Sequence, residues 1–203
     1  MSSSERIGFI GLGTMGKPMC LRLAAAGYEV TGYDIAPGPL KEAVEAGVVA
    51  GANSAEVAGR TDLLLTSLAN PDQVAMVMEG SGALAALRLG SVWVDLSTNR
   101  RELIQRLSEN APEGVSVADA PLTGAVDGAR NGRLTIFIGG AETTVAKVAP
   151  VLKHLGQVIS CGPLGAGNVV KLVTNQLWFV AAAAIGEAAA AVVVACLLYT
   201  SPS

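Results

Sequence analysis

Cysteine is scarce in this 203-residue chain, and the few that occur are not arranged as ligands. The three cysteines, Cys20, Cys161 and Cys196, lie far apart, and none belongs to a C-x-x-C pair. Metal sites need closely spaced ligands, and a disulfide framework needs an even number of cysteines. The sequence therefore predicts no metal site and reduced thiols, as in a cytoplasmic protein.

Positive charge and aromatic residues are also in short supply. The 14 lysines and arginines stand against 17 aspartates and glutamates, which gives a net charge of -3, and aromatic residues make up 4% of the chain. Proteins that bind phosphate backbones present basic patches, so this balance argues against a nucleic-acid partner. The first residues, MSSSER, contain no apolar segment, and we expect no signal peptide.

Apolar residues and glycine are plentiful, and they follow an alternating pattern. Hydrophobic residues make up 51% of the chain, which also has 24 glycines. The predicted strands are RIGFIG (6–11), YEVTGYD (28–34), GVVAG (47–51), DLLLTSL (62–68), SVWVDLS (91–97), VSVADAP (115–121), LTIFIGG (134–140) and GQVISCG (156–162). The predicted helices include 14–26, 70–79, 100–110 and 141–155. Such alternation predicts an α/β fold, with a doubly wound, mostly parallel sheet covered by helices on both faces.

The pattern changes after Pro163, where no further strand is predicted. From GAGNVVKLVTNQ onward the chain is helical and apolar. We therefore predict one domain over residues 1–163, and a long interdomain helix over 164–203 that leads into an all-helical second domain, largely missing. Residues 177–198 are long enough to span a bilayer, but Glu187 at their centre makes insertion costly. The sequence thus favours a buried helix between packed neighbours over a membrane span.

The last residues, LLYTSPS, lose the alanine-rich pattern of the helix before them. We interpret the chain as a truncated gene fragment whose final residues are not native, the alternative being a short protein with a frayed tail. An apolar helix face left exposed over 176–198 would predict self-association, because such a patch would otherwise face water.

A glycine-rich segment follows the first predicted strand and opens the first predicted helix. It reads Gly11-Leu12-Gly13-Thr14-Met15-Gly16, a G-x-G-x-x-G pattern. The first glycine permits a tight turn, the second lets the backbone approach a pyrophosphate, and the third lets helix and strand pack closely. The pyrophosphate would meet the N-terminal N–H groups of the helix. The segment therefore predicts a dinucleotide site, the alternative being a glycine turn without a ligand.

Asp34, at the end of the second predicted strand, completes this fingerprint. A carboxylate there can accept both ribose hydroxyls and would repel a 2′-phosphate. No lysine or arginine follows until Lys41. The sequence therefore favours NAD as the cofactor, with NADP less favoured.

Four segments together resemble the β-hydroxyacid dehydrogenase family, which includes 3-hydroxyisobutyrate dehydrogenase and tartronate semialdehyde reductase. They are GFIGLGTMGKPM (8–19), DLST (95–98), DAPLTGA (119–125) and GAGNVVKLVTNQ (165–176), in the order in which the family has them. The resemblance covers the chain to about Ala195. It implies a Rossmann domain, an interdomain helix and a helical domain, of which this chain lacks nearly all of the third.

Lys171 is the residue best suited to manage the proton of a substrate hydroxyl. It lies in the apolar run NVVKLVTN, where burial would lower its pKa toward working pH. The resemblance places the family's catalytic lysine at this position; the alternative is a lysine that extends to solvent from a partly buried helix. Asn175, four residues on, would share its helix face and orient the substrate. Thr174 stands where the phosphogluconate dehydrogenases have His, which argues against a decarboxylating enzyme.

Two further segments supply the remaining site residues. Thr123 and Gly124 offer a hydroxyl and backbone N–H groups for a substrate carboxylate; the family usually has Ser-Gly-Gly here, and this chain has Thr-Gly-Ala. A plain turn is the alternative. By resemblance, Ser97 and Thr98, with Leu68 and Ala69, would line the nicotinamide side. The alternative for Ser97 or Thr98 is to cap the helix that follows.

His154 and Cys161 are not expected to take part in chemistry. His154, the single histidine, lies at a predicted helix end, where a capping or solvated role is expected. Cys161 has no histidine partner in the pattern, so a thiol nucleophile is not expected.

The leading hypothesis is therefore an NAD-dependent oxidoreductase of small β-hydroxyacids or their semialdehydes, a homo-oligomer when full length. The alternative from another class is a truncated NAD-binding module with little or no turnover. Imine reduction, found in the same wider superfamily, is a third possibility, against which Lys171 argues.

Overall fold

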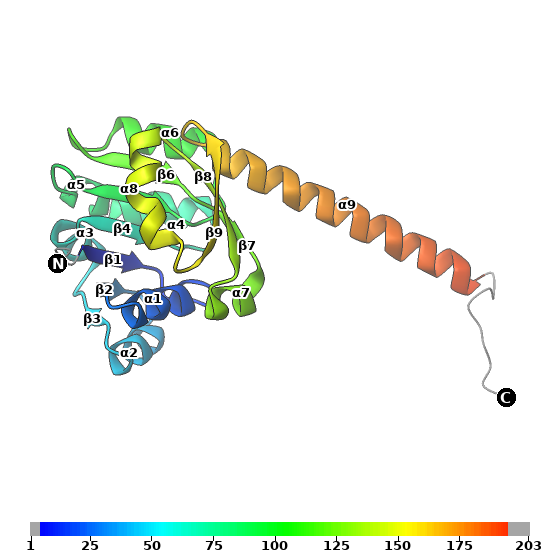
Figure 1. The fold of residues 1–203 in the computed structure, drawn as a ribbon, viewed down its shortest axis with the longest axis horizontal. Coiled ribbons are helices and arrows are strands. Elements are labelled where there is room, and N and C mark those ends of the chain that lie inside the picture. The colour runs from blue at the N-terminus through cyan, green and yellow to red at the C-terminus, as the bar shows by residue number, and fades with distance from the viewer. Residues whose placement is uncertain (1–4, 195–203) are drawn as a thin grey trace. The chain divides into compact units, whose positions relative to one another are not determined.

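The computed structural model describes residues 5–194, so the predictions about Cys196 and the final residues lie outside its range. In chain order the strands are β1 (Arg6–Ile10), β2 (Glu29–Tyr33), β3 (Val49–Ala50), β4 (Leu63–Thr66), β5 (Val92–Asp95), β6 (Ser116–Asp119), β7 (Leu122–Thr123), β8 (Leu134–Gly139) and β9 (Gly156–Gly162). The helices are α1 (Gly16–Ala25), α2 (Pro37–Glu45), α3 (Ser54–Arg60), α4 (Pro71–Ala75), the π-helical turn η1 (Met76–Gly80), α5 (Ala83–Ala86), α6 (Arg101–Glu109), α7 (Ala125–Asn131), α8 (Glu142–Leu152) and α9 (Ala166–Val194). Figure 1 shows their arrangement.

The strands form one sheet with the order β3-β2-β1-β4-β5-β6-β8-β7, and β9 pairs with β8. The neighbours from β3 to β6 are all parallel, as are β8 and β9. Strand β8 is antiparallel to its neighbours β6 and β7, so β8 and β9 run opposite to the other described strands. The predicted α/β class with a mostly parallel, Rossmann-type sheet is confirmed.

The central strands are buried on both faces, which explains their continuous apolar sequences. In β4, Leu63 and Leu65 belong to the core on one face of the sheet, and Leu64 belongs to the core on the other. Helices α1 and α8 supply apolar side chains to the first core, and α3 and α6 supply them to the second. Successive residues of a strand point to opposite faces, so one apolar run serves both layers.

Local features explain the short elements, some of which the sequence analysis did not predict. Helices α3 and α4 begin after Asn53 and Asn70, whose side chains accept hydrogen bonds from the N–H groups of Glu56 and Gln73. The predicted helix over 70–79 is α-helical only to Ala75 and continues as the π-helical turn η1. The two-residue strand β7 is too short to leave a periodic pattern.

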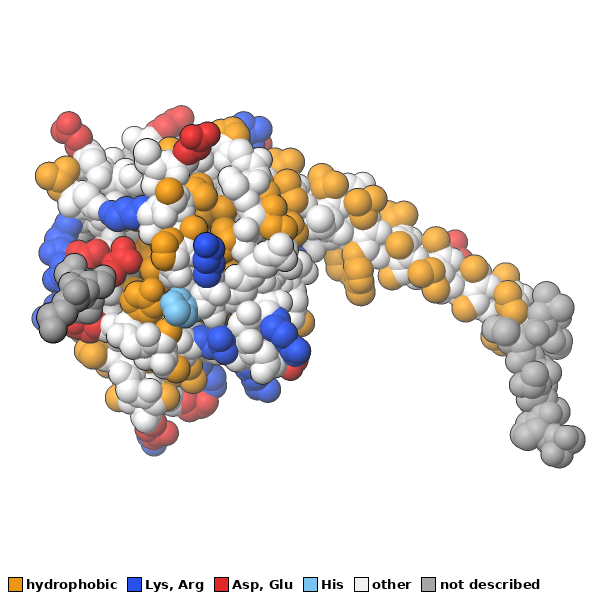
Figure 2. All heavy atoms as spheres, viewed as in Figure 1, with side chains coloured by type: hydrophobic (Ala, Val, Ile, Leu, Met, Phe, Trp, Pro, Cys, Tyr) orange, Lys and Arg blue, Asp and Glu red, His pale blue; other side chains and the backbone are white. Residues whose placement is uncertain are grey.

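The chain divides into two compact units, one that ends at Lys171 and one that begins at Leu172. The first unit contains the sheet and the first turns of α9, and the domain boundary predicted at 163/164 stays a prediction. In the second unit almost all described side chains of α9 are exposed, and Figure 2 shows apolar spheres along it. The predicted burial of this helix is therefore wrong for the residues that the structure describes.

Helix α9 is long and apolar enough to cross a membrane, by length and composition alone. Glu187 lies within it, in a stretch otherwise made of small and aliphatic residues. That the chain has no membrane span stays a prediction.

Candidate functional site

The glycine-rich turn between β1 and α1 has the geometry that each glycine was expected to provide. Gly11 has φ +92°, a backbone conformation that side chains disfavour, and a Cβ there would lie 2.3 Å from the Ser67 carbonyl oxygen. A Cβ on Gly16 would lie 1.8 Å from the Gly11 carbonyl oxygen, so helix and strand approach too closely for any side chain. At Gly13 a Cβ would meet nothing within 4 Å, so the turn is open to a ligand there.

Asp34 joins this turn to the end of β2. Its Oδ2 accepts a hydrogen bond of 2.6 Å from the Leu12 N–H, and its Oδ1 accepts one of 2.8 Å from the Ala36 N–H. The Leu12 N–H group is thus hydrogen-bonded to Asp34. The Leu12 side chain is fully buried in the core, so it cannot line a ligand site. Each carboxylate oxygen can accept more than one hydrogen bond, so the ribose-binding role predicted for Asp34 fits this geometry. Thr14 is exposed and Met15 half-buried beside it.

The two segments predicted to line the nicotinamide side are joined by a hydrogen bond. The Leu68 N–H donates to Ser97 Oγ at 2.9 Å, and the Ser97 N–H donates to Asp95 Oδ1 at 3.1 Å. Helix α6 begins at Arg101 without a side-chain cap, so neither Ser97 nor Thr98 caps it. Both segments lie at the carboxyl edge of the sheet, where ligands of open α/β sheets bind. Ala69 donates its N–H to Gln73 Oε1, and Thr98 is exposed.

Thr123 and Gly124 are exposed at the junction between β7 and α7. Gly124 has φ +127°, and the next residue, Ala125, has φ +53°. Ala125 is the one described residue other than glycine with a positive φ. The residue that departs from the family's usual glycine thus occupies a backbone conformation that glycine adopts more easily.

Lys171 lies near the start of α9 with a side chain only 9% exposed. Burial lowers its pKa, which is the direction the sequence predicted. Asn175 lies one turn further along α9 and is half-buried. The structure therefore gives Lys171 the environment of a proton-transfer group, while its catalytic role stays a prediction.

Two buried aspartates at the carboxyl edge were not singled out by the sequence. Asp95 ends β5 and accepts hydrogen bonds from the side chains of Thr66 and Asn99. Asp119 ends β6 and accepts three hydrogen bonds: one from the N–H of Gly165, just before α9, and two from the N–H and Nδ2 of Asn168, in the first turn of α9. Burial raises the pKa of both carboxyl groups, and these bonds oppose that rise. The signal that could have revealed them is a charged residue at the end of a strand that is otherwise apolar, apart from Ser116 in β6.

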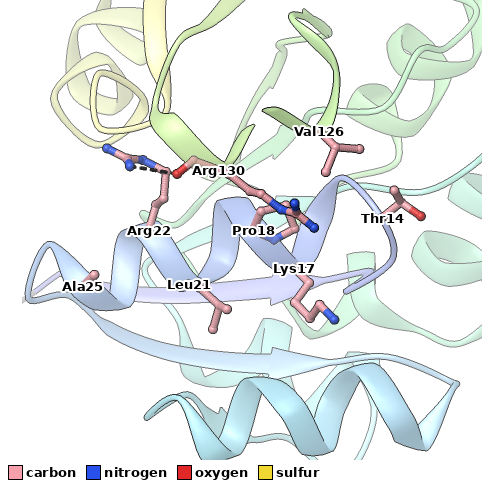
Figure 3. Close-up of a pocket in the computed structure, with 8 residues that line it drawn as sticks. All are labelled: Thr14, Lys17, Pro18, Leu21, Arg22, Ala25, Val126 and Arg130. Carbon is pink, nitrogen blue, oxygen red and sulfur yellow. Dashed lines mark hydrogen bonds between the residues drawn. The ribbon is translucent and has the colours of Figure 1, made fainter. Parts of the chain in front are cut away.

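A pocket of about 580 Å³ lies along α1, and of the predicted site residues it is lined by Thr14 alone. Figure 3 shows that it is lined by α1 together with Val126 and Arg130 of α7. Arg22 binds the backbone carbonyls of His154 and Arg130 at 2.9 and 3.1 Å. It therefore joins α1 to the ends of α7 and α8.

His154 and Cys161 occupy surroundings without catalytic partners among the described residues. The His154 ring makes an edge contact with Tyr28, with 5.5 Å between ring centroids. Burial and the charge of Asp119 raise the pKa of the Cys161 thiol, which makes it a poor nucleophile. The described residues also contain no cluster of side chains that could hold a metal ion.

Comparison with known proteins shows which family the chain resembles. Residues 6–165 match the family model described as the NAD binding domain of 6-phosphogluconate dehydrogenase. The chain is 38% identical over 191 residues to 2-(hydroxymethyl)glutarate dehydrogenase from Eubacterium barkeri, and the match covers 93% of this chain and 64% of that protein. It is 36% identical to the mitochondrial 3-hydroxyisobutyrate dehydrogenase of Mus musculus, with 93% and 57% covered.

A solved structure agrees with these matches. The structure of Mycobacterium tuberculosis 3-hydroxyisobutyrate dehydrogenase with L-serine superposes with a TM-score of 0.88 at 33% identity, covering 93% of this chain and 65% of that one. The chain thus spans somewhat less than two thirds of the length of each of these proteins. Through its NAD-binding domain, which matches that of 6-phosphogluconate dehydrogenase, the chain belongs to the β-hydroxyacid dehydrogenase family.

Proposed function

We propose that this chain is the cofactor-binding, lysine-bearing part of an NAD-dependent oxidoreductase that acts on small β-hydroxyacids or their semialdehydes. The observation that carries the proposal is that the buried Lys171 belongs to the same compact unit as the glycine-rich turn. The names of the relatives, which act on 3-hydroxyisobutyrate and 2-(hydroxymethyl)glutarate, support this substrate class.

The dinucleotide would be held by the turn Gly11–Gly16 and by Asp34. The open face of Gly13 gives a pyrophosphate access to the N-terminal N–H groups of α1. When bound, the nicotinamide supplies the site that accepts or returns a hydride. Leu68, Ala69, Ser97 and Thr98 are proposed to line its side of the crevice, with Leu68 and Ser97 held together by their hydrogen bond.

The remaining residues would handle the substrate. Lys171 in its neutral form takes the proton of the substrate hydroxyl, and in its protonated form it returns a proton to a carbonyl oxygen. Thr123 and Gly124 would bind the substrate carboxylate through a hydroxyl and a backbone N–H, and Asn175 would orient the reacting carbon. The lowered pKa of Lys171 makes both protonation states accessible nearer to neutral pH.

NAD, and not NADP, is the proposed cofactor because Asp34 places a carboxylate at the end of β2, hydrogen-bonded to the glycine-rich turn. The nearest following cation, Lys41, lies 3.9 Å from Glu45 in an ion pair within α2. A 2′-phosphate beside Asp34 would cost about 1–4 kcal/mol in repulsion. Calorimetric titration should therefore give a Kd for NAD at least about tenfold lower than that for NADP; equal affinities would refute the preference.

Replacing the lysine tests the catalytic assignment. In a version that turns over, Lys171→Ala should lower kcat by about 100-fold or more, because general acid–base catalysis contributes on that order. The Kd for NAD should change little, since the glycine turn and Asp34 are untouched. Comparable losses in kcat and in NAD affinity would count against the role of Lys171.

A second candidate function is NAD binding without turnover, and the coverage of the relatives favours it. Because the chain spans 64% of its Eubacterium relative, residues outside it can complete the substrate site. The chain should be compared with a chimera that adds the residues following the equivalent helix in 3-hydroxyisobutyrate dehydrogenase. If both proteins bind NAD and only the chimera turns over substrate, the binding-module function is supported. If the chain turns over substrate without the added residues, that function is rejected.

The proposal also covers the location of the protein in the cell and its oligomeric state. A cytoplasmic location and a homo-oligomeric state when full length are proposed, with a small hydroxyacid as the binding partner. Fractionation of cells that express the tagged protein tests the first. Imine reduction is disfavoured because Lys171 is a proton-transfer group suited to hydroxyl chemistry, and an assay with a cyclic imine and NADH would check this.

A further inference from the structure

A continuous chain of buried polar groups joins the first turn of α9 to the ends of β5 and β6. Asp119 Oδ2 accepts from the N–H and the Nδ2 of Asn168, at 2.6 and 3.1 Å, and its Oδ1 accepts from the Gly165 N–H at 2.6 Å. The Asn168 Oδ1 in turn accepts from the Asn99 N–H at 2.7 Å. Asn99 Nδ2 then donates to Asp95 Oδ2 at 3.0 Å.

This chain reaches the nicotinamide-side segments of the proposed site. Asp95 accepts the Ser97 N–H, and Ser97 accepts the Leu68 N–H. Every donor and acceptor in it lies in the first compact unit, and no buried side-chain nitrogen or oxygen among the described residues lacks a partner. A fully satisfied buried network specifies one arrangement of the elements it joins.

The backbone around the network leaves no room for that arrangement to shift. A Cβ on Gly139 would lie 2.5 Å from Asp119 Oδ1, and a Cβ on Gly167 would lie 2.2 Å from the Phe137 carbonyl oxygen. Helix α9 therefore begins in direct contact with the ends of β6 and β8. Its first turn cannot rotate or slide without breaking hydrogen bonds to a buried carboxylate, which is costly.

Lys171 follows Asn168 by three residues, which is less than one helical turn. The orientation of the first turn thus sets where the lysine side chain lies. We propose that Asp119 and Asn168 are positioning residues, which fix Lys171 relative to the segments that carry Leu68 and Ser97. The proposal rests on the proposed function for its catalytic consequence, but the position of Lys171 can be measured without turnover.

Asn168→Ala is the main test, because it removes two links without changing charge. The chain has five lysines, so reductive ¹³C-methylation gives an NMR spectrum in which each can be assigned by Lys→Arg substitution. In the folded variant we expect the pKa of Lys171 to rise toward its ordinary value, because water reaches a less firmly held side chain. The ¹³C-methyl signals of Lys147 and Lys153 are internal controls and should be unchanged in the variant.

Asp119→Asn and Asp62→Asn complete the test. Removing the Asp119 charge alone would lower the pKa of Lys171, whereas losing its position would raise it, so an upward shift identifies the positioning effect. Asp62 is the control, because it directly precedes β4, at the amino ends of the parallel strands, and pairs with Arg6 and Arg88. If the pKa of Lys171 stays unchanged in folded Asn168→Ala, or falls in Asp119→Asn, the proposal is overturned.

Kinetic measurements distinguish a failure of this proposal from a failure of the proposed function. In the chimera described above, Asn168→Ala should lower kcat about 10- to 100-fold, since a displacement of about 1 Å can cost that much, and leave the Kd for NAD unchanged. A shifted pKa with unchanged kcat would support the positioning role and reject Lys171 as the catalytic group. An unshifted pKa with a reduced kcat would reject the positioning role.

Discussion

At the scale of single residues, the substrate-side turn contains a local strain at Ala125. Its φ of +53° lies in the left-handed region, which costs a residue with a Cβ about 1–2 kcal/mol relative to glycine. The family's usual Ser-Gly-Gly would carry no such cost. The methyl group that alanine has and the family's usual glycine lacks therefore strains the backbone.

Ala125→Gly should therefore stabilise the fold. The relieved strain of about 1–2 kcal/mol is offset by the roughly 0.4–1 kcal/mol that glycine adds through the entropy of the unfolded chain, so a net gain of up to about 1.5 kcal/mol is expected. Urea denaturation measures it.

Ala146→Gly is the matched control for this change. Ala146 is exposed within α8 and has no positive φ, so glycine there should cost about 1 kcal/mol. If both substitutions destabilise the protein by similar amounts, Ala125 is not strained.

At the scale of the element, Gly13 and Gly16 in the segment that joins β1 to α1 are explained by different physical requirements. Gly16 is required by packing, because a Cβ would overlap the Gly11 carbonyl group. Gly13 has open space on its Cα, so the fold does not require glycine there. The need for a glycine at position 13 would come from a ligand that approaches the backbone.

Gly13→Ala and Gly16→Ala should accordingly have different effects. Gly13→Ala should leave the melting temperature nearly unchanged and weaken NAD binding about tenfold or more, because its methyl group occupies the space of the pyrophosphate. Gly16→Ala should lower the melting temperature markedly, since backbone must move. Thermal denaturation and calorimetric NAD titration distinguish the two. Unimpaired NAD binding by Gly13→Ala would contradict the dinucleotide site.

The ends of elements are where prediction from sequence was least complete. The predicted strands and helices were found to within a few residues, because apolar periodicity and glycine reflect local packing needs. The antiparallel direction of β8 and the short elements β7 and α7 were not predicted. Strand direction depends on how far the connecting segment must travel, and a short loop through β7 and α7 leaves no pattern of its own.

At the scale of the whole molecule, the exposed apolar side chains of α9 are the feature that most affects behaviour in solution. Leu177, Trp178 and Phe179 are each more than 60% exposed. Contiguous apolar surface of this kind promotes association, because burial against another surface removes it from water. The sequence-based expectation of self-association therefore stands as a prediction with structural support.

Size-exclusion chromatography with light scattering should show a mass above that of a monomer. Leu177→Glu should shift the chain toward monomer, because a charge placed in a buried apolar contact is costly. Gln176→Glu adds the same charge at an adjacent polar position of α9 and should have little effect. If the unsubstituted chain is a monomer at all concentrations, the prediction of self-association is wrong. Flotation with liposomes would test whether α9 binds a membrane instead.

The sequence by itself determined the order of strands and helices, the glycine turn, the carboxylate at the end of β2 and the lysine in an apolar helix. These follow from residues close together in the chain, whose steric and hydrophobic requirements are local. Only the tertiary structure decided that Asp119 binds the start of α9, that Asn168 meets Asn99, and that Ser97 holds Leu68 and caps no helix. Those partners lie 29 to 69 positions apart, and no local pattern can specify which carboxylate a distant N–H group will meet.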